Sequence, residues 1–167
     1  MKNGYLQLKR YFEEISKKHK QIKDFSGYFA RETQQKMGSY AGIGSPFLTI
    51  FNYELGLDGG ELNTIGTRKL TFSVLYHNPA FDNFEAQQEA IDNAEKIALQ
   101  ILARIKRDHN TKDHFMYNSF QKDMTKIFPV EDPNIQVYGV DVVVHFRNKE
   151  PLIVESDVWE DGITNCG

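Results

Sequence analysis

The sequence has little cysteine and no long apolar run, and these two absences exclude several classes of protein. A single cysteine, Cys166, stands among the 167 residues, so neither an intramolecular disulfide nor a cluster of cysteine metal ligands can form. No stretch reaches the roughly 18 apolar residues that a membrane-spanning helix requires. The first residues reach Lys9 without an apolar run of signal-peptide length. We therefore expect a soluble protein of the cell interior, with no membrane partner.

The composition is otherwise that of an ordinary folded domain. Hydrophobic residues make up 40% of the chain and charged residues 26%, and there are 12 Phe, 8 Tyr and 1 Trp. A disordered chain has far fewer aromatic residues, and this length suits one domain with its own core. We expect a single domain over residues 1–149, followed by a C-terminal segment of different composition.

Negative charge is concentrated in that last segment. Residues 150–167 carry five acids and no lysine or arginine, whereas the 149 residues before them carry 18 acids and 20 bases. A nearly neutral body lacks the clustered basic face of non-specific nucleic-acid binding, and we expect no sequence-specific binding either. The segment is either a solvated terminus or an acidic arm that docks on a basic neighbour. Val158 and Trp159 favour the arm, because an exposed tryptophan is a good interface anchor.

Two helices are predicted, because apolar residues recur at three- and four-residue spacings in two segments. The first spans residues 3–22. The second is longer: Asp82 and Glu85 form a capping box at its start, and an apolar stripe follows for about six turns. Acids near its beginning and bases near its end complement the helix dipole, which accounts for them without a catalytic role. The stripe comprises Phe84, Ile91, Ala94, Ala98, Ile101, Leu102 and Ile105.

Strands are predicted where apolar and polar residues alternate. Residues 47–57 and 69–77 are rich in β-forming residues, and 135–146 is the strongest strand pattern in the chain. Residues 115–130 are ambiguous, because a four-residue spacing also fits a helix, but their β-branched residues and closing proline favour a strand. A shorter edge strand is expected at 151–159.

Two segments are expected to lack regular structure. Residues 24–45 mix aromatics with Gly and Ser without a sustained period, and connectors of this length are often functional. Residues 58–67 are glycine-rich and are expected as a protruding loop between the first two strands. The order helix, strand, strand, helix, strand, strand predicts an α+β domain: an antiparallel β-sheet with the long helix and the N-terminal helix packed on one side.

No residue pattern indicates catalysis or metal binding clearly. The five histidines are scattered, and no pair has the spacing of a zinc-binding helix. Asp58, Glu61 and Asn63 offer oxygen ligands, but they lack the pattern of a calcium loop. Cys166 lies too near the end of the sequence to be assigned as a nucleophile. We therefore predict a protein that is not an enzyme and that carries no metal or cofactor.

One alternative is that the protein is an enzyme whose active site contains Asp141 and Glu155. The segment around them resembles the core of restriction-type nucleases, in which an Asp and a Glu-x-Lys on adjacent strands hold Mg²⁺ and activate water. Asp157 stands where that family carries its lysine, so the attacking hydroxide would lack its stabilising cation. The body also lacks a basic groove for DNA. The structural alternative places Asp141 on the solvent face of a strand.

The order and size of the predicted elements resemble the tail terminator and tail-completion proteins of long-tailed bacteriophages. The resemblance covers residues 3–147. In that family the strand after the final turn typically reads as an aromatic residue, a glycine and a hydrophobic run that ends in a polar aromatic stretch. Residues 137–148 (VYGVDVVVHFRN) look like this strand.

The resemblance implies a ring, most often a hexamer, at the head-proximal end of the tail tube. Such a ring stops tube polymerisation and joins the tail to the head, so the implied partners are further copies of the chain, the tail tube protein and the head–tail connector protein, within the virion. A heterologous ring needs two different complementary faces, which the body and the acidic arm could supply. The residues expected at subunit or partner contacts are Asp58, Glu61, Glu155, Asp157, Trp159, Glu160 and Asp161.

Three other interpretations stay open at this point. The chain could be a different neck, connector or tail-tube subunit of such a particle. It could be the metal-dependent nuclease of Asp141 and Glu155, or a stand-alone bacterial adaptor domain. Cleavage of DNA in the presence of Mg²⁺ or Mn²⁺ would favour the nuclease, and ring formation would favour a structural subunit.

Overall fold

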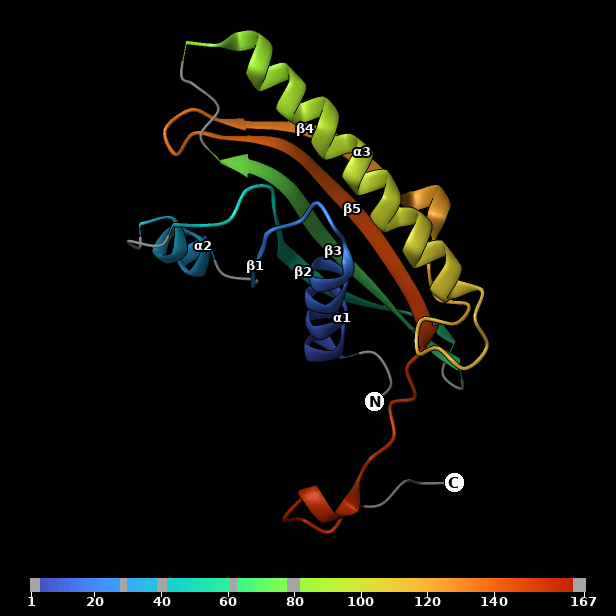
Figure 1. Cartoon of the computed structure of the whole chain (residues 1–167). Helices are drawn as coiled ribbons and strands as arrows, with labels where there is room; N and C mark the ends of the chain where they lie inside the picture. Colours follow the sequence, from blue (N-terminus) through green and yellow to red (C-terminus); the bar gives the residue numbers. More distant parts are fainter. Residues whose placement is uncertain (1–3, 28–29, 39–41, 61–62, 78–81, 164–167) are drawn as a thin grey trace.

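A computed structural model of the chain describes residues 4–27, 30–38, 42–60, 63–77 and 82–163. Helices and strands are mixed along the chain, which confirms the predicted α+β class (Figure 1). None of the described helices combines the length and apolarity needed to cross a membrane. The elements are α1 (Tyr5–Lys18), β1 (Asp24–Ser26), α2 (Ala30–Met37), β2 (Phe47–Gly60), β3 (Asn63–His77), α3 (Phe84–His109), β4 (Lys126–Asp132) and β5 (Val137–Lys149), with short 3₁₀ turns at Lys122–Met124 and Ser156–Val158.

Five strands form one twisted sheet in the order β1-β2-β3-β5-β4. Four of them pair antiparallel, but β1 pairs parallel with β2, so the sheet is mixed where an antiparallel sheet was predicted. Helices α1 and α3 lie side by side on one face of this sheet, as predicted (Figure 1). Helix α1 covers the β1–β2 side, and α3 crosses β3 and β5.

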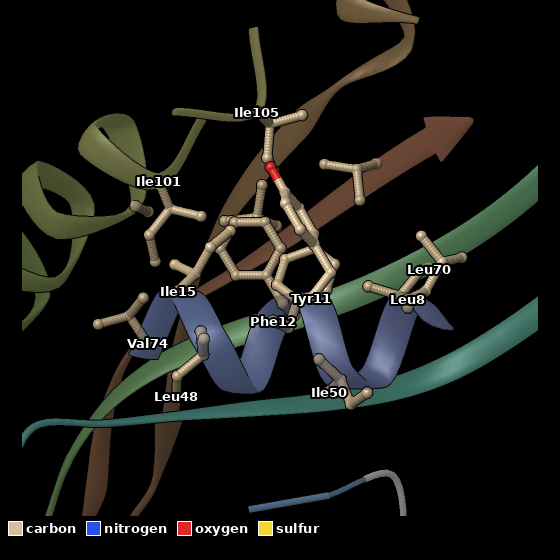
Figure 2. Packing of buried hydrophobic residues seen from close by; sticks show 14 of the residues in the cluster. Leu8, Tyr11, Phe12, Ile15, Leu48, Ile50, Leu70, Val74, Ile101 and Ile105 are labelled. Carbon is tan, nitrogen blue, oxygen red and sulfur yellow. The ribbon is translucent and has the colours of Figure 1, made fainter. Parts of the chain in front are cut away.

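The main core lies between the sheet and these two helices. Every second residue of β3 and β5 points into it, because strand side chains alternate between the two faces. Phe12 of α1 packs on Phe72 of β3 with ring centroids 5.2 Å apart, and Ile101 of α3 is buried in the same layer. Figure 2 shows Phe12 and Ile101 of this layer between the helices and the strands. The predicted face of β5 is confirmed: Tyr138, Val140, Val142, Val144 and Phe146 are all buried.

A buried polar contact joins the two helices at one end of this core. The Tyr11 hydroxyl of α1 donates to the Asp108 carboxylate of α3 at 2.8 Å, and Arg104 Nε donates to the same carboxylate at 2.9 and 3.1 Å. Burial and the neighbouring carboxylate raise the pKa of Tyr11 far above its usual range, so its hydroxyl keeps its proton at any physiological pH. The contact satisfies a carboxylate that would otherwise be costly to bury.

Several predicted boundaries are wrong, each for a local reason. The connector at 24–45 contains β1 and α2, which are too short to show a period in sequence. Helix α3 is capped by Asn83, whose side chain accepts from Ala86 N at 3.0 Å, rather than by a box starting at Asp82, and its first residue Phe84 is exposed.

The strand predictions are corrected at three places. The expected loop at 58–67 is the far end of a long hairpin, because β2 runs to Gly60 and β3 starts at Asn63. Within 115–130, only the last part is a strand, β4, and the preceding residues form turns around the buried Met116. The edge strand expected at 151–159 is absent: the described residues there are extended, with one 3₁₀ turn, and pair with no strand.

Gly139 of β5 lies opposite Leu75 of β3, where the backbone leaves no room for a side chain. A Cβ atom added there would overlap the carbonyl oxygen of Val74 and lie 3.0 Å from the Cα of Leu75. We expect Gly139→Ala to lower the free energy of unfolding by about 3 kcal/mol, because backbone atoms of a central strand pair would have to move. Gly60→Ala, where an added Cβ meets nothing within 4 Å, is the matched control and should change stability by less than about 0.5 kcal/mol. Urea unfolding measures both, and equal effects would contradict this account of the β3–β5 contact.

Candidate assembly surface

The C-terminal arm, residues 150–163, leaves the body at the end of β5 and extends away from the sheet (Figure 1). Its large apolar side chains are exposed: Val158 to 67% and Trp159 to 56%, although burial is the usual fate of such groups in a folded domain. Single exposed apolar residues are common on protein surfaces, but a group of them on one short segment indicates an interaction site. The exposed apolar residues of the arm are Leu152, Ile153, Val158, Trp159 and Ile163.

The acids predicted to make contacts lie on the same segment. Glu155, Asp157, Glu160 and Asp161 are all exposed, and none of the four forms an ion pair within the part of the chain that the structure describes. The arm therefore combines unpaired negative charge with exposed apolar groups. This composition is complementary to a surface that has cations beside an apolar patch.

The root of the arm is held by a partly buried ion pair that the sequence did not indicate. Arg68 of β3 is only 1% exposed, and its guanidinium donates from Nη2 to the carboxylate of Glu150. Among the described residues, Nε and Nη1 of Arg68 have no hydrogen-bond partner. Glu150 also donates its backbone N–H to the carbonyl of Thr64 at 3.0 Å. The first residue of the arm is thus attached to the β2–β3 hairpin by both its backbone and its side chain.

A signal for Arg68 was present in the strand pattern. The alternation of Leu70, Phe72 and Val74 extends back by two residues to position 68, which places Arg68 on the buried face of β3. Glu150 carries no comparable signal, because its partner lies 82 positions away in the sequence.

A cleft of about 920 Å³ lies beside the arm root. It is bounded by Gln7 at the start of α1, by the turn that contains His114, and by Ile153 and Glu155 of the arm. Its lysines, Lys112 and Lys149, are offset by acids, including Glu150, so it has no marked excess of positive charge.

Of the other predicted contact residues, the structure describes Asp58. Asp58 lies near the end of β2 and accepts from Arg147 Nη2 of β5 at 3.2 Å. Glu61 lies outside the described residues. Since both partners of the Asp58–Arg147 pair are largely exposed, it contributes little to stability.

Asp141 lies on the sheet face opposite α1 and α3, at the middle of β5. It is half-buried and accepts a hydrogen bond from the Ser73 hydroxyl of β3 at 2.5 Å. Burial raises the pKa of its carboxyl group, and the hydrogen bond from Ser73 acts in the opposite direction.

The structure does not bring Asp141 and Glu155 together on adjacent strands. Lys149 lies eight positions after Asp141 in β5, about 26 Å along the strand, and Glu155 lies further along, in the arm. Across the described ranges, no group of three or more His, Cys, Asp or Glu side chains could hold a metal ion.

The two histidines nearest each other in sequence have structural roles. His109 Nδ1 accepts from the backbone N–H of Phe120 at 3.1 Å, and His114 Nδ1 accepts from that of Met116 at 3.2 Å. Both bonds stabilise the turns that follow α3. These histidines therefore fix the chain path between α3 and β4.

Removing the Glu150 carboxylate should destabilise the whole body. Glu150→Ala leaves the buried Arg68 guanidinium without a counter-charge, and we expect a loss of about 3–5 kcal/mol in the free energy of unfolding. Glu155→Ala, an exposed acid of the same arm, is the control and should change stability by less than about 0.5 kcal/mol. Urea unfolding compares the two. Arg68→Met combined with Glu150→Gln should recover most of the loss, and a double variant as unstable as Glu150→Ala would contradict the ion-pair explanation.

The chain was also compared with known proteins. No family model matches it, and no curated protein matches it either.

Proposed function

We propose that this chain is a structural subunit of a tailed phage or phage-like particle, the tail terminator that forms a ring at the head-proximal end of the tail tube. Its role is assembly rather than catalysis: the ring closes the tube and provides the surface to which the head connector binds. The proposal joins the resemblance of residues 3–147 to that family with the properties of the arm.

The observation that carries the assembly role is the exposed apolar arm. Five large apolar side chains lie on residues 152–163 and are at least 46% exposed in the single chain. Burial of each such side chain stabilises by about 1.5–3 kcal/mol, so a partner that covers several of them gains substantial affinity. A segment whose apolar side chains are not buried against the rest of its own chain is suited to bind another molecule.

A closed ring also requires two different contact surfaces on each subunit. In a heterologous ring each subunit presents two different surfaces, one to each neighbour. The arm, with a charge of -5 over residues 150–167, provides one surface, and a body with 20 bases and 18 acids provides the other. Because Glu150 is bound to the hairpin, the arm leaves every copy at the same point, as a repeated contact requires.

The implied partners are the tail tube protein on one side of the ring and the head–tail connector protein on the other. A subunit of the neck or of the tube would use the same arm in the same way. The position of the ring along the tail distinguishes these roles.

The arm variant Val158→Ser/Trp159→Ala should abolish assembly without unfolding the body. Light scattering over a concentration series measures the mass, and we expect a hexamer-sized species for the unaltered chain and a monomer for the variant. The physical reason is the loss of the two apolar anchors, each of which contributes on the order of 2 kcal/mol when buried at a contact.

Phe84→Ser is the matched control, because Phe84 is an exposed aromatic residue outside the arm. It should leave the mass unchanged, and circular dichroism should show the same fold for all three proteins. Ring formation by the Val158→Ser/Trp159→Ala variant would contradict the proposal. A stable two-fold dimer of the unaltered chain would also contradict it, because a self-complementary face has the wrong symmetry for a tube end.

A further inference from the structure

A groove lined by lysines lies at the β1 edge of the sheet, between α1, β1 and α2. Its volume is about 520 Å³, and its lining includes Lys9, Lys17, Lys23 and Lys36. The groove has apolar surface as well, because the buried Ile22 and the half-buried Phe25 form part of its wall. Cations beside an apolar wall are the counterpart of the composition of the arm.

The acids of the groove are already paired with two of these lysines. Lys17 Nζ lies 2.6 Å from Glu13, and Lys36 Nζ lies 3.5 Å from Asp24 and 3.9 Å from Glu32. Lys17, and more weakly Lys9 and Lys36, lower the pKa of Glu13, so this acid stays ionised as part of the pairing.

The other two lysines have no carboxylate within the described part of the chain. Lys9 pairs with no acid, and Lys23 Nζ donates only to the carbonyl of Lys20 at 3.4 Å. The segment from Ser16 to Lys23 holds four lysines and no acid. Four lysines and three carboxylates line the groove, so its lining carries a net charge of +1.

The position of the groove favours an arm from another copy. The groove lies at the β1 edge of the sheet, whereas the arm starts at the end of β5, three strand positions away, and leads away from the body (Figure 1). An arm at one site and an acceptor at another are the two different surfaces that a heterologous contact needs.

We propose that the acidic arm of one copy docks in the lysine groove between α1, β1 and α2 of the next copy in the ring. This inference rests on the proposed function and names the surface on which the arm binds. Asp157, Glu160 and Asp161 pair with the groove lysines that lack a carboxylate, and Val158 and Trp159 cover the wall formed by Ile22 and Phe25. The charges guide the approach of the arm, and the apolar contacts slow its release.

The native cysteine allows a direct test on the unaltered chain. Cys166 follows the arm closely in sequence and is the only thiol, so a short thiol-to-amine cross-linker attached there reacts with lysines near the docked arm. Unlabelled and ¹⁵N-labelled protein are mixed in equal amounts, assembled and cross-linked, and the linked peptides are identified by mass spectrometry. Cys166→Ser is the control for reagent that reacts elsewhere.

The proposal predicts links between chains of different label, from Cys166 to the groove lysines Lys9, Lys17, Lys23 or Lys36. Rings in which Cys166 links to lysines outside the groove, or only to its own chain, would overturn the docking site and leave the proposed function standing. A protein that forms no assembly under any tested condition would overturn both.

Charge reversal provides a second test that does not depend on the cross-linker. Lys9→Glu/Lys23→Glu changes the two groove lysines that have no carboxylate partner, so the body should fold normally. We expect subunit affinity to fall about tenfold or more at low salt, with a smaller fall at high salt. Lys106→Glu/Lys126→Glu is the control, because both lysines are exposed and lie outside the groove. Equal affinities for the two variants would overturn the docking site.

Adding Asp157→Lys/Glu160→Lys to the groove variant should restore part of the lost affinity, because the charges are then opposite again. The same arm change in the unaltered groove should weaken assembly. An arm change with the same effect in both backgrounds would show that arm and groove do not meet.

Discussion

Arg68 brings a guanidinium into the apolar layer between the sheet and its helices, and the fold must neutralise it there. The counter-charge comes from Glu150, the first residue after β5, so the ion pair links the middle of the chain to its end. Removing one partner of such a pair costs more stability than the intact pair contributes, because it leaves a buried charge without a counter-charge. The pair therefore fixes Glu150 beside Arg68. The chain leaves the sheet at this point, after Lys149 at the end of β5.

The body and the arm differ in how they expose apolar and charged side chains. The body buries its apolar residues on both helices and on the sheet, and the Tyr11–Asp108 contact closes the polar end of that core. The arm has the opposite character, with exposed apolar groups and unpaired acids. A lysine groove elsewhere on the body has the complementary character. These three features together are the basis of the proposal that the chain is a subunit of a larger assembly.

Elements with a long, regular pattern could be predicted from the sequence. Helix α3 and strand β5 repeat their apolar residues over enough turns or positions to identify the element and its buried face. Short elements could not, because β1 has three residues and forms only through its pairing with β2. The acidic composition of residues 150–167 was visible in the sequence. The Arg68–Glu150 pair and the lysine groove could not be predicted, because they depend on contacts between segments that lie far apart in the sequence.

Trp159 is the only tryptophan in the chain, so its fluorescence reports the arm alone. The most direct test is its emission spectrum and its quenching by acrylamide across a protein concentration series, with mass measured in parallel. The account predicts long-wavelength emission and full quenching for the monomer, and a shift to shorter wavelength with protection from quenching as assemblies form. Assemblies in which Trp159 keeps the emission and quenching of the monomer would contradict the claim that the arm makes the subunit contact.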